Sequence, residues 1–95
     1  MDYGKTNTYD NLLPDGTDEL VRITNIVIPN TFRNKRTRQK KIFEVLDYYE
    51  THGCFDKPIR VSKSKKYGVV LVDEYSRYVC AKYIYNMTYL PVKYV

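Results

Sequence analysis

The chain has 95 residues, which suffices for one small domain with a single hydrophobic core and is too short for a multidomain enzyme. Hydrophobic residues make up 43% and charged residues 28% of the chain, and this balance excludes a disordered tail or a fibre. The net charge of +5 favours polyanionic partners or simply serves solubility. No apolar run has the length of a membrane span, and the first residues lack a leader pattern. We therefore expect a cytoplasmic protein without a membrane partner.

The first 19 residues are expected to form a polar arm in front of the folded domain. Most of its charged residues are acidic, namely Asp2, Asp10, Asp15, Asp18 and Glu19. The Pro-Asp-Gly sequence at 14–16 is a turn signal rather than part of a regular element. These features place the arm at residues 1–19 and the domain at residues 20–95.

The first half of the domain predicts a strand followed by a helix. Residues 20–28 are rich in β-branched side chains and end at Pro29, a pattern typical of a strand followed by a turn. Further along, apolar residues recur at the spacing of an amphipathic helix, at Ile42, Val45, Leu46 and Tyr49. Gly53 follows the last of these residues and can adopt the left-handed conformation that ends a helix.

The second half predicts two strands, a helix and a final strand. Residues 58–61 alternate between apolar and polar, and the continuous apolar run at 67–73 predicts a buried strand. A second helix is expected to begin at Asp73, whose carboxylate suits the N-cap position. Residues 90–95 form the last strand, and Pro91 favours a place at the sheet edge or at the strand's first position.

The cysteines and the single histidine predict neither a disulfide framework nor a metal site. Cys54 and Cys80 form no CxxC pair and have no histidine at metal-ligand spacing. His52 lies close to Cys54, but neighbouring side chains at a helix end point in different directions. We therefore interpret His52 as a cation at the helix C-terminus rather than as half of a Cys-His catalytic pair.

Three segments of the chain resemble the ParB/sulfiredoxin superfamily. They are residues 53–61 (GCFDKPIRV), 69–82 (VVLVDEYSRYVCAK) and 90–92 (LPV). Members of that family carry G-x-x-x-P-I-x-V, then I-L-V-D-G-x-x-R-x-x-A-A-K, then a closing V-P-V strand. The resemblance covers residues 21–95 and implies a compact α+β domain of ParB/sulfiredoxin type, with a small mixed sheet and two helices. It also implies that Cys80 and Ala81 are the small pair that packs the second helix on the sheet.

The resemblance implies a phosphate site in the turn before the second helix. Arg77 matches the family's arginine, and Ser76 and Tyr75 belong to the same turn, so these three are candidate phosphate- or nucleotide-binding residues. Asp73 precedes the position of the family's glycine, where this chain has Glu74. The bulk and charge of Glu74 disfavour a nucleotide such as CTP or ATP with Mg²⁺. No cofactor is therefore expected.

Other departures from the family pattern narrow the expected activity. Tyr75 stands where sulfiredoxins have their catalytic cysteine, so reduction of sulfinic acids is not expected. Ser76 precedes Arg77, whereas the partition proteins have consecutive arginines in this turn. The chain also lacks the helix-turn-helix domain of those proteins, so we do not expect operator-type recognition.

A basic run precedes and opens the first predicted helix. It consists of Arg33, Lys35, Arg36, Arg38, Lys40 and Lys41, and a second basic group follows at Lys63, Lys65 and Lys66. Such residues either solvate a surface or neutralise nucleic-acid phosphates, which gives salt-dependent affinity without sequence information. Cations at a helix N-terminus oppose the macrodipole, and this favours a functional role for the first group. Among the 11 tyrosines, Tyr75 and Tyr78 flank Arg77 and are the aromatic candidates for function.

These observations leave three functional hypotheses. The leading one is a small ParB-like, DNA-associated accessory protein of plasmid or mobile-element type, with a degenerate nucleotide-phosphate site. The alternative is a protein-interaction module or homodimer without nucleotide binding. The third is a nuclease or phosphate-transfer enzyme that uses Asp73, Glu74 and Arg77. A helix cap at Asp73 and the macrodipole at Glu74 explain both carboxylates without catalysis, so the sequence favours a binding module over an enzyme.

Overall fold

The computed structural model describes residues 13–95, so residues 1–12, the greater part of the predicted arm, lie outside the described residues. Its strands are β1 (Glu19–Arg22), β2 (Ile26–Val27), β3 (Ile59–Ser64), β4 (Gly68–Asp73) and β5 (Tyr89–Tyr94). Its α-helices are α2 (Asn30–Arg33), α3 (Gln39–His52) and α4 (Tyr75–Val79). A 3₁₀ turn, η1 (Ile23–Asn25), joins β1 to β2, and a π-helical segment, η2 (Cys80–Ile84), extends α4.

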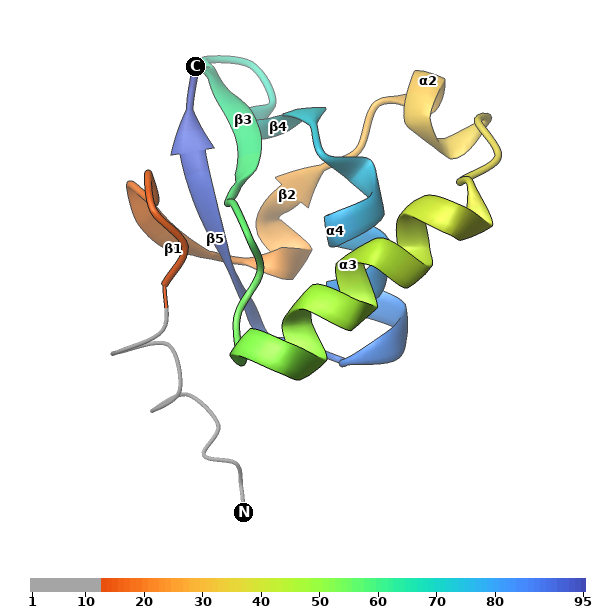
Figure 1. Ribbon diagram of the computed structural model, residues 1–95. Helices are drawn as coiled ribbons and strands as arrows, with labels where there is room; N and C mark the ends of the chain where they lie inside the picture. Colours follow the sequence, from red (N-terminus) through yellow and green to blue (C-terminus); the bar gives the residue numbers. More distant parts are fainter. Residues whose placement is uncertain (1–12) are drawn as a thin grey trace.

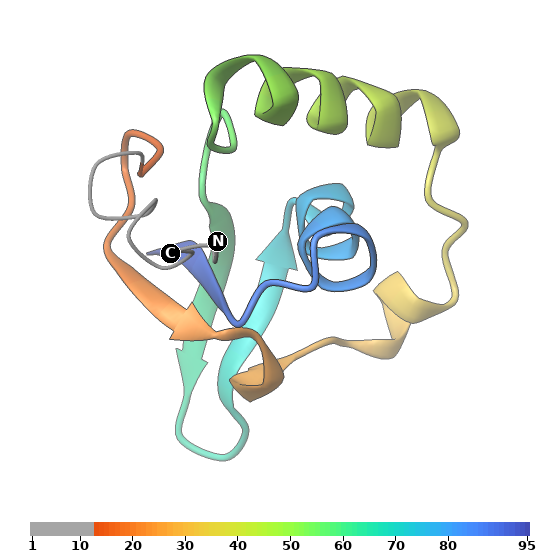
Figure 2. The same ribbon diagram turned by 90° about the horizontal axis from the view of Figure 1, so that it is seen from below.

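The strands form one curled mixed sheet in the order β1-β5-β3-β4-β2 (Figure 1). Neighbours β1 and β5, like β3 and β4, run antiparallel, whereas β3 with β5 and β2 with β4 run parallel. Viewed from below, the α4–η2 segment lies between the sheet and α3 (Figure 2). The α+β class and the small mixed sheet are thus confirmed, while the prediction of two helices missed the single turn of α2.

The predicted strand at residues 20–28 is wrong, because this segment is broken by η1. Its buried residues are Val21, Ile23, Ile26 and Ile28. The spacing of two residues is interrupted between Ile23 and Ile26, and the 3₁₀ turn accommodates the extra residue. The break also lets β1 pair with β5 at one edge of the sheet while β2 pairs with β4 at the other.

Strand β4 is less buried than its apolar sequence predicted. Only Leu71 is fully buried, whereas Val69 and Val70 are half-buried and Val72 is exposed. Helices cover a single face of the sheet (Figure 2), so the side chains that alternate onto the other face remain near solvent. The prediction of a buried strand at 67–73 therefore holds for one position only.

Strand β5 lies inside the sheet, and Pro91 is its third residue. The proline predicted a sheet edge or the first position of the strand, and both predictions are wrong. β5 pairs with β1 on one side and with β3 on the other. Its pairing with β3 starts at Val92, opposite Ile59, so Pro91 precedes that ladder. A proline at this point removes no backbone donor that β3 would use, which explains why the interior strand tolerates it.

Helix α3 and the α4–η2 segment follow the predicted pattern closely. The N–H of Gly53 donates to the carbonyl of Tyr49 at 2.8 Å, and the left-handed conformation of Gly53 (φ 78°) ends α3 as predicted. Cys80 and Ala81 are completely buried in the hydrophobic core, in the segment that lies between the sheet and α3. Both cysteines are free thiols. No helix in residues 13–95 is long and apolar enough to cross a membrane.

Candidate functional site

The N-cap of the second predicted helix lies one residue later than predicted. Helix α4 starts at Tyr75 and has Glu74, not Asp73, at its N-cap. The N–H of Glu74 donates to Oδ1 of Asp73 at 2.7 Å, so the Asp73 carboxylate holds the residue before the helix instead of capping it. The other Asp73 oxygen lies 3.7 Å from Arg60, and both side chains are exposed.

Glu74 adopts a left-handed backbone conformation, with φ 71° and ψ 41°. Glycine enters this region freely, whereas a residue with a Cβ atom is disfavoured there by about 1 kcal/mol. The family pattern that the chain resembles has a glycine at this position. The unusual backbone of Glu74 is therefore the conformation for which a glycine would be best suited.

The carboxylate of Glu74 points into an ion-pair network with Arg77 and Lys57. NH1 of Arg77 donates to Oε1 of Glu74 at 2.9 Å, and Nζ of Lys57 lies 3.4 Å from Oε2. The Glu74 side chain is only 10% exposed. We expected this carboxylate to occupy a phosphate position, but the structure turns it towards Arg77.

Arg77 is 3% exposed, and its guanidinium is held mainly by Asp56. Nε and NH2 of Arg77 donate to the two carboxylate oxygens of Asp56, each at 2.8 Å. These hydrogen bonds lower the pKa of Asp56. The predicted phosphate-binding arginine thus has its donors directed to two carboxylates of its own chain.

Asp56 is a site residue that sequence reasoning missed. It lies three residues beyond Gly53 in a loop, and 21 positions separate it from Arg77. No local pattern connects the two residues. Arg77 was the only indication of such a partner in the sequence. An arginine in a helix with apolar residues on most faces is buried, and a buried guanidinium requires an acceptor.

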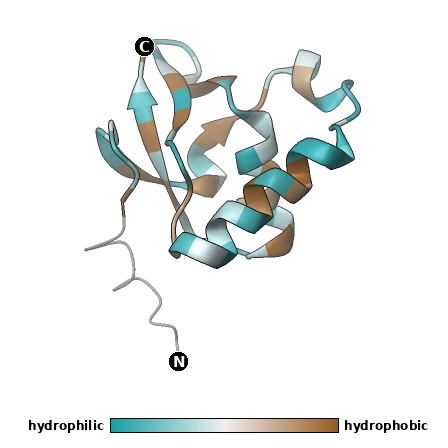
Figure 3. Ribbon diagram, in the orientation of Figure 1, coloured by the Kyte–Doolittle hydropathy of each residue, from teal (hydrophilic) through white to brown (hydrophobic). Residues whose placement is uncertain are grey.

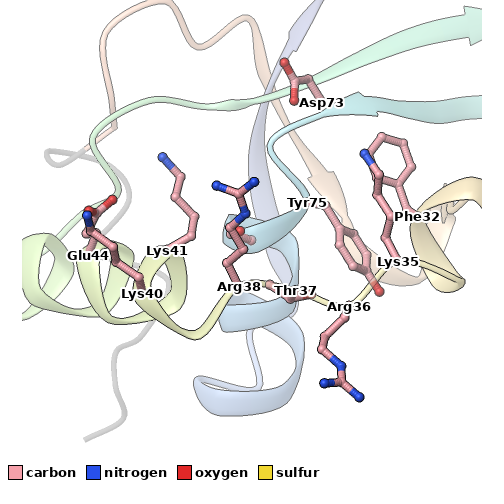
Figure 4. Close-up of a pocket in the computed structure, with 11 residues that line it drawn as sticks. Phe32, Lys35, Arg36, Thr37, Arg38, Lys40, Lys41, Glu44, Asp73 and Tyr75 are labelled. Atoms are coloured by element: carbon pink, nitrogen blue, oxygen red, sulfur yellow. The ribbon is translucent and has the colours of Figure 1, made fainter.

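The basic run and the start of α4 line one pocket, with a volume of about 640 Å³ (Figure 4). Its predicted residues are Lys35, Arg36, Arg38, Lys40, Lys41, Asp73, Tyr75 and Ser76, and Phe32, Thr37 and Glu44 complete the lining. The structure therefore brings together two groups of candidates that lie more than 30 positions apart in the chain. Glu74 and Arg77 do not line the pocket.

The cations approach the pocket from three local structures. Lys35 and Arg36 lie in the loop after α2, Arg38 is the N-cap of α3, and Lys40 and Lys41 belong to the first turn of α3. In Figure 4 the side chains of Arg38 and Lys41 extend to the same side of the backbone, whereas Arg36 extends to the opposite side. Arg38 and Lys41 therefore share a direction in which a single anion could contact both.

Arg33 does not belong to this cationic group. Its Nε donates to the carbonyl of Ile28 at 3.2 Å, which ties the end of α2 to the segment after β2. Arg33 is absent from the pocket lining. Its position favours a structural role, although the sequence grouped it with the nucleic-acid candidates.

An aromatic pair borders the cations. The rings of Phe32 and Tyr75 lie 5.4 Å apart and are tilted by 34°. Tyr75 is half-buried and lines the pocket, whereas its stacking partner Tyr78, 5.9 Å away, is buried in the core. Of the two tyrosines singled out by sequence, only Tyr75 lines the pocket.

The second basic group has a different environment. Nζ of Lys63 lies 4.8 Å from the centre of the Tyr94 ring, and Nζ of Lys66 lies 5.3 Å from that of Tyr67. These cation–π contacts occur around an exposed turn between β3 and β4. The group therefore provides a natural comparison for the pocket cations.

The carboxylates and the histidine do not converge on the pocket. Asp73 lines it, but the neighbouring Glu74 carboxylate points to Arg77. His52 stacks on Tyr48 with ring centres 3.9 Å apart, and its Nδ1 lies 3.1 Å from the Tyr48 carbonyl oxygen. Within residues 13–95 no three His, Cys, Asp or Glu side chains are grouped for a metal ion. The pocket is thus mainly a cationic surface with aromatic and hydroxyl groups at its border.

No family model and no curated protein matches the chain.

Proposed function

We propose that this protein is a small DNA-associated binding module of ParB-like type. It holds backbone phosphates in the pocket between α4 and the basic loop, the segment at 34–38 that joins α2 to α3. The observation that supports this function best is the pocket itself. It combines five cations with two carboxylates, the hydroxyls of Thr37 and Ser76, and the rings of Phe32 and Tyr75. The left-handed Glu74 at the position of the family's turn glycine supports the same relationship.

The arrangement of the cations favours an anionic ligand over a merely solvated surface. Lys40 and Lys41 lie in the first turn of α3, where positive charges oppose the helix macrodipole. Arg38 and Lys41 carry the same charge and extend to the same side of the backbone, an arrangement that is unfavourable without an anion (Figure 4). A phosphate between them would remove both unfavourable effects.

The pocket suits a phosphate of a polymer better than a free nucleotide. In the resembled family an arginine of the turn assists nucleotide phosphates, but here Arg77 is engaged by Asp56 and Glu74. The remaining cations lie along a loop and a helix start, which can follow a phosphate backbone. No nucleotide cofactor is therefore part of the proposal.

Single-stranded DNA fits this pocket better than duplex DNA does. A concave volume of about 640 Å³ can hold a base and its phosphate, but it cannot enclose a duplex. Tyr75 lies beside the cations and offers a ring on which a base can stack, an interaction of about 1–3 kcal/mol per base. We expect single-stranded oligonucleotides to bind more tightly than duplexes of the same length.

The test is fluorescence anisotropy with labelled oligonucleotides over a series of salt concentrations. The triple variant Lys35→Gln, Arg38→Gln, Lys41→Gln is expected to weaken binding roughly tenfold or more and to flatten the salt dependence. The plot of log K against log salt has a negative slope, and each lost phosphate contact makes it less steep by about 0.7 for a single strand. The control is Lys63→Gln, Lys65→Gln, Lys66→Gln, which removes the same charge from the end of β3 and the turn that follows it.

Equal losses in the two triple variants would contradict the proposal, because affinity would then depend on net charge and not on the pocket. Absence of binding by the wild-type protein at low salt would also contradict it. Tyr75→Leu provides an independent check of base stacking. It is expected to reduce the preference for single strands while leaving the salt slope unchanged.

A further inference from the structure

A large apolar side chain projects from the middle of α3. Phe43 is 60% exposed, and Ile84 at the end of η2 is also exposed. Figure 3 shows apolar bands in the middle of α3, interrupted by hydrophilic ones, and hydrophilic residues at both ends of the helix. Contiguous exposed apolar side chains commonly mark a contact surface, and Phe43 lines one hollow together with Ile42, Leu46 and Ile84.

Phe43 forms a ridge between two hollows. One hollow, of about 630 Å³, is bordered by Ile42, Leu46 and Ile84 together with the basic loop. The other, of about 800 Å³, is bordered by Leu46, Asp47 and Glu50. Phe43 lines both. A projection beside a hollow of apolar character is the shape that a self-complementary surface requires.

The charges on α3 are separated along its length. Arg38, Lys40 and Lys41 lie at its start, Glu44 lies near its middle, and Asp47 and Glu50 lie in its second half. Two copies of α3 packed antiparallel would place each basic start against the acidic half of the other copy. Opposite charges at a border favour this orientation and disfavour the parallel one.

From these features we propose that the protein forms a symmetric homodimer through antiparallel packing of α3, with Phe43 of each copy in the hollow beside Leu46 and Ile84 of the other. The twofold axis passes near the middle of the helix, between Phe43 and Leu46. Lys40 of each copy then approaches Asp47 of the other. Lys40 also lines the phosphate pocket, so the dimer has to be tested in the absence of nucleic acid.

The charge pattern also distinguishes a second copy from other occupants of this surface. Glu44, Asp47 and Glu50 border one hollow beside Phe43, whereas Arg36 and Arg38 border the other. A nucleic acid or an anionic membrane would be attracted to the basic hollow but repelled by the acidic one. A partner with a uniformly acidic or basic surface would match only one half of α3. A second α3 in the opposite direction matches both halves.

Sedimentation equilibrium of the full chain without nucleic acid tests the dimer, from about 1 µM to about 1 mM, a range that includes weak associations. Wild type is expected to shift from monomer to dimer within this range. Phe43→Ser is expected to weaken dimerisation roughly tenfold or more, since central aromatic anchors dominate interfaces. Tyr67→Ser is the matched control, because Tyr67 is equally exposed, at 60%, and lies in the β3–β4 turn.

A charge exchange tests the orientation of the two helices. Lys40→Glu and Asp47→Lys are each expected to weaken the dimer, and the double variant is expected to recover most of the loss. A monomeric wild type over the whole range would overturn the proposal. So would a dimer that Phe43→Ser leaves intact, or one that the double variant fails to restore. Circular dichroism of each variant separates loss of association from loss of folding.

Discussion

Replacing Asp56 with alanine is expected to lower the free energy of unfolding by about 3 kcal/mol. The guanidinium of Arg77 is 3% exposed and stays charged at any practical pH. Without Asp56 it would lose two hydrogen bonds of 2.8 Å and keep only its contact with Glu74. The Asp56 side chain is 36% exposed, so water can enter its place and hold the loss at the lower end of the range for buried pairs.

Urea unfolding of the two proteins measures this difference. Asp47→Ala serves as the control, because it removes the same charge from an exposed position on α3. At low protein concentration, its effect is expected to stay within about 0.5 kcal/mol, as for most surface substitutions. A loss for Asp56→Ala as small as that of the control would show that Arg77 does not depend on Asp56.

The Asp56–Arg77 pair also predicts how stability changes with acid. The hydrogen bonds from Arg77 lower the pKa of Asp56 in the folded protein below its ordinary value of 3.8. A carboxylate with a lowered pKa stabilises the fold above the ordinary value, and that contribution is lost as the pH falls through the folded value. The difference in free energy of unfolding between wild type and Asp56→Ala should therefore be constant near neutrality and shrink below about pH 4. A difference independent of pH would contradict this assignment.

Local sequence signals predicted the elements that depend on local physics. The spacing of Ile42, Val45, Leu46 and Tyr49, followed by Gly53, fixed helix α3 and its end because periodic burial and a left-handed residue act within a few turns. Local signals could not predict the order of the strands in the sheet. The 3₁₀ break between Ile23 and Ile26, and the interior place of β5, follow from pairing between distant strands. The rule for proline in strands failed at Pro91 because the β3 ladder begins after it.

The candidate site was predictable in parts but not as a whole. Charge and resemblance identified the basic run and the turn at 73–77 separately, and only the packing of the α2–α3 loop against α4 places them around one pocket. The same packing separates residues that sequence had grouped. Arg33 binds the carbonyl of Ile28, and Arg77 binds Asp56 across 21 positions, so neither lines the pocket.

Substitutions at Glu74 test two features of the turn, its ion pair with Arg77 and its left-handed backbone. Glu74→Ala is expected to lower the free energy of unfolding by about 2 kcal/mol, because NH1 of the buried Arg77 loses a charged acceptor. Glu74→Gly removes the same carboxylate but also relieves the left-handed backbone at φ 71°. It is expected to be more stable than Glu74→Ala by about 1 kcal/mol, after allowance for the greater freedom of glycine in the unfolded chain.

Gly68→Ala measures the same backbone effect elsewhere in the protein. Gly68 has φ 85°, and a Cβ atom there would meet no other atom within 4 Å, so the substitution tests the left-handed backbone without a steric clash. Its loss of stability, about 1 kcal/mol, should match the difference between Glu74→Gly and Glu74→Ala. If the two Glu74 variants are equally stable while Gly68→Ala is destabilised, the left-handed conformation is not a strain at position 74. The turn would then relax around any side chain, and the correspondence with a family glycine would have no basis in backbone geometry.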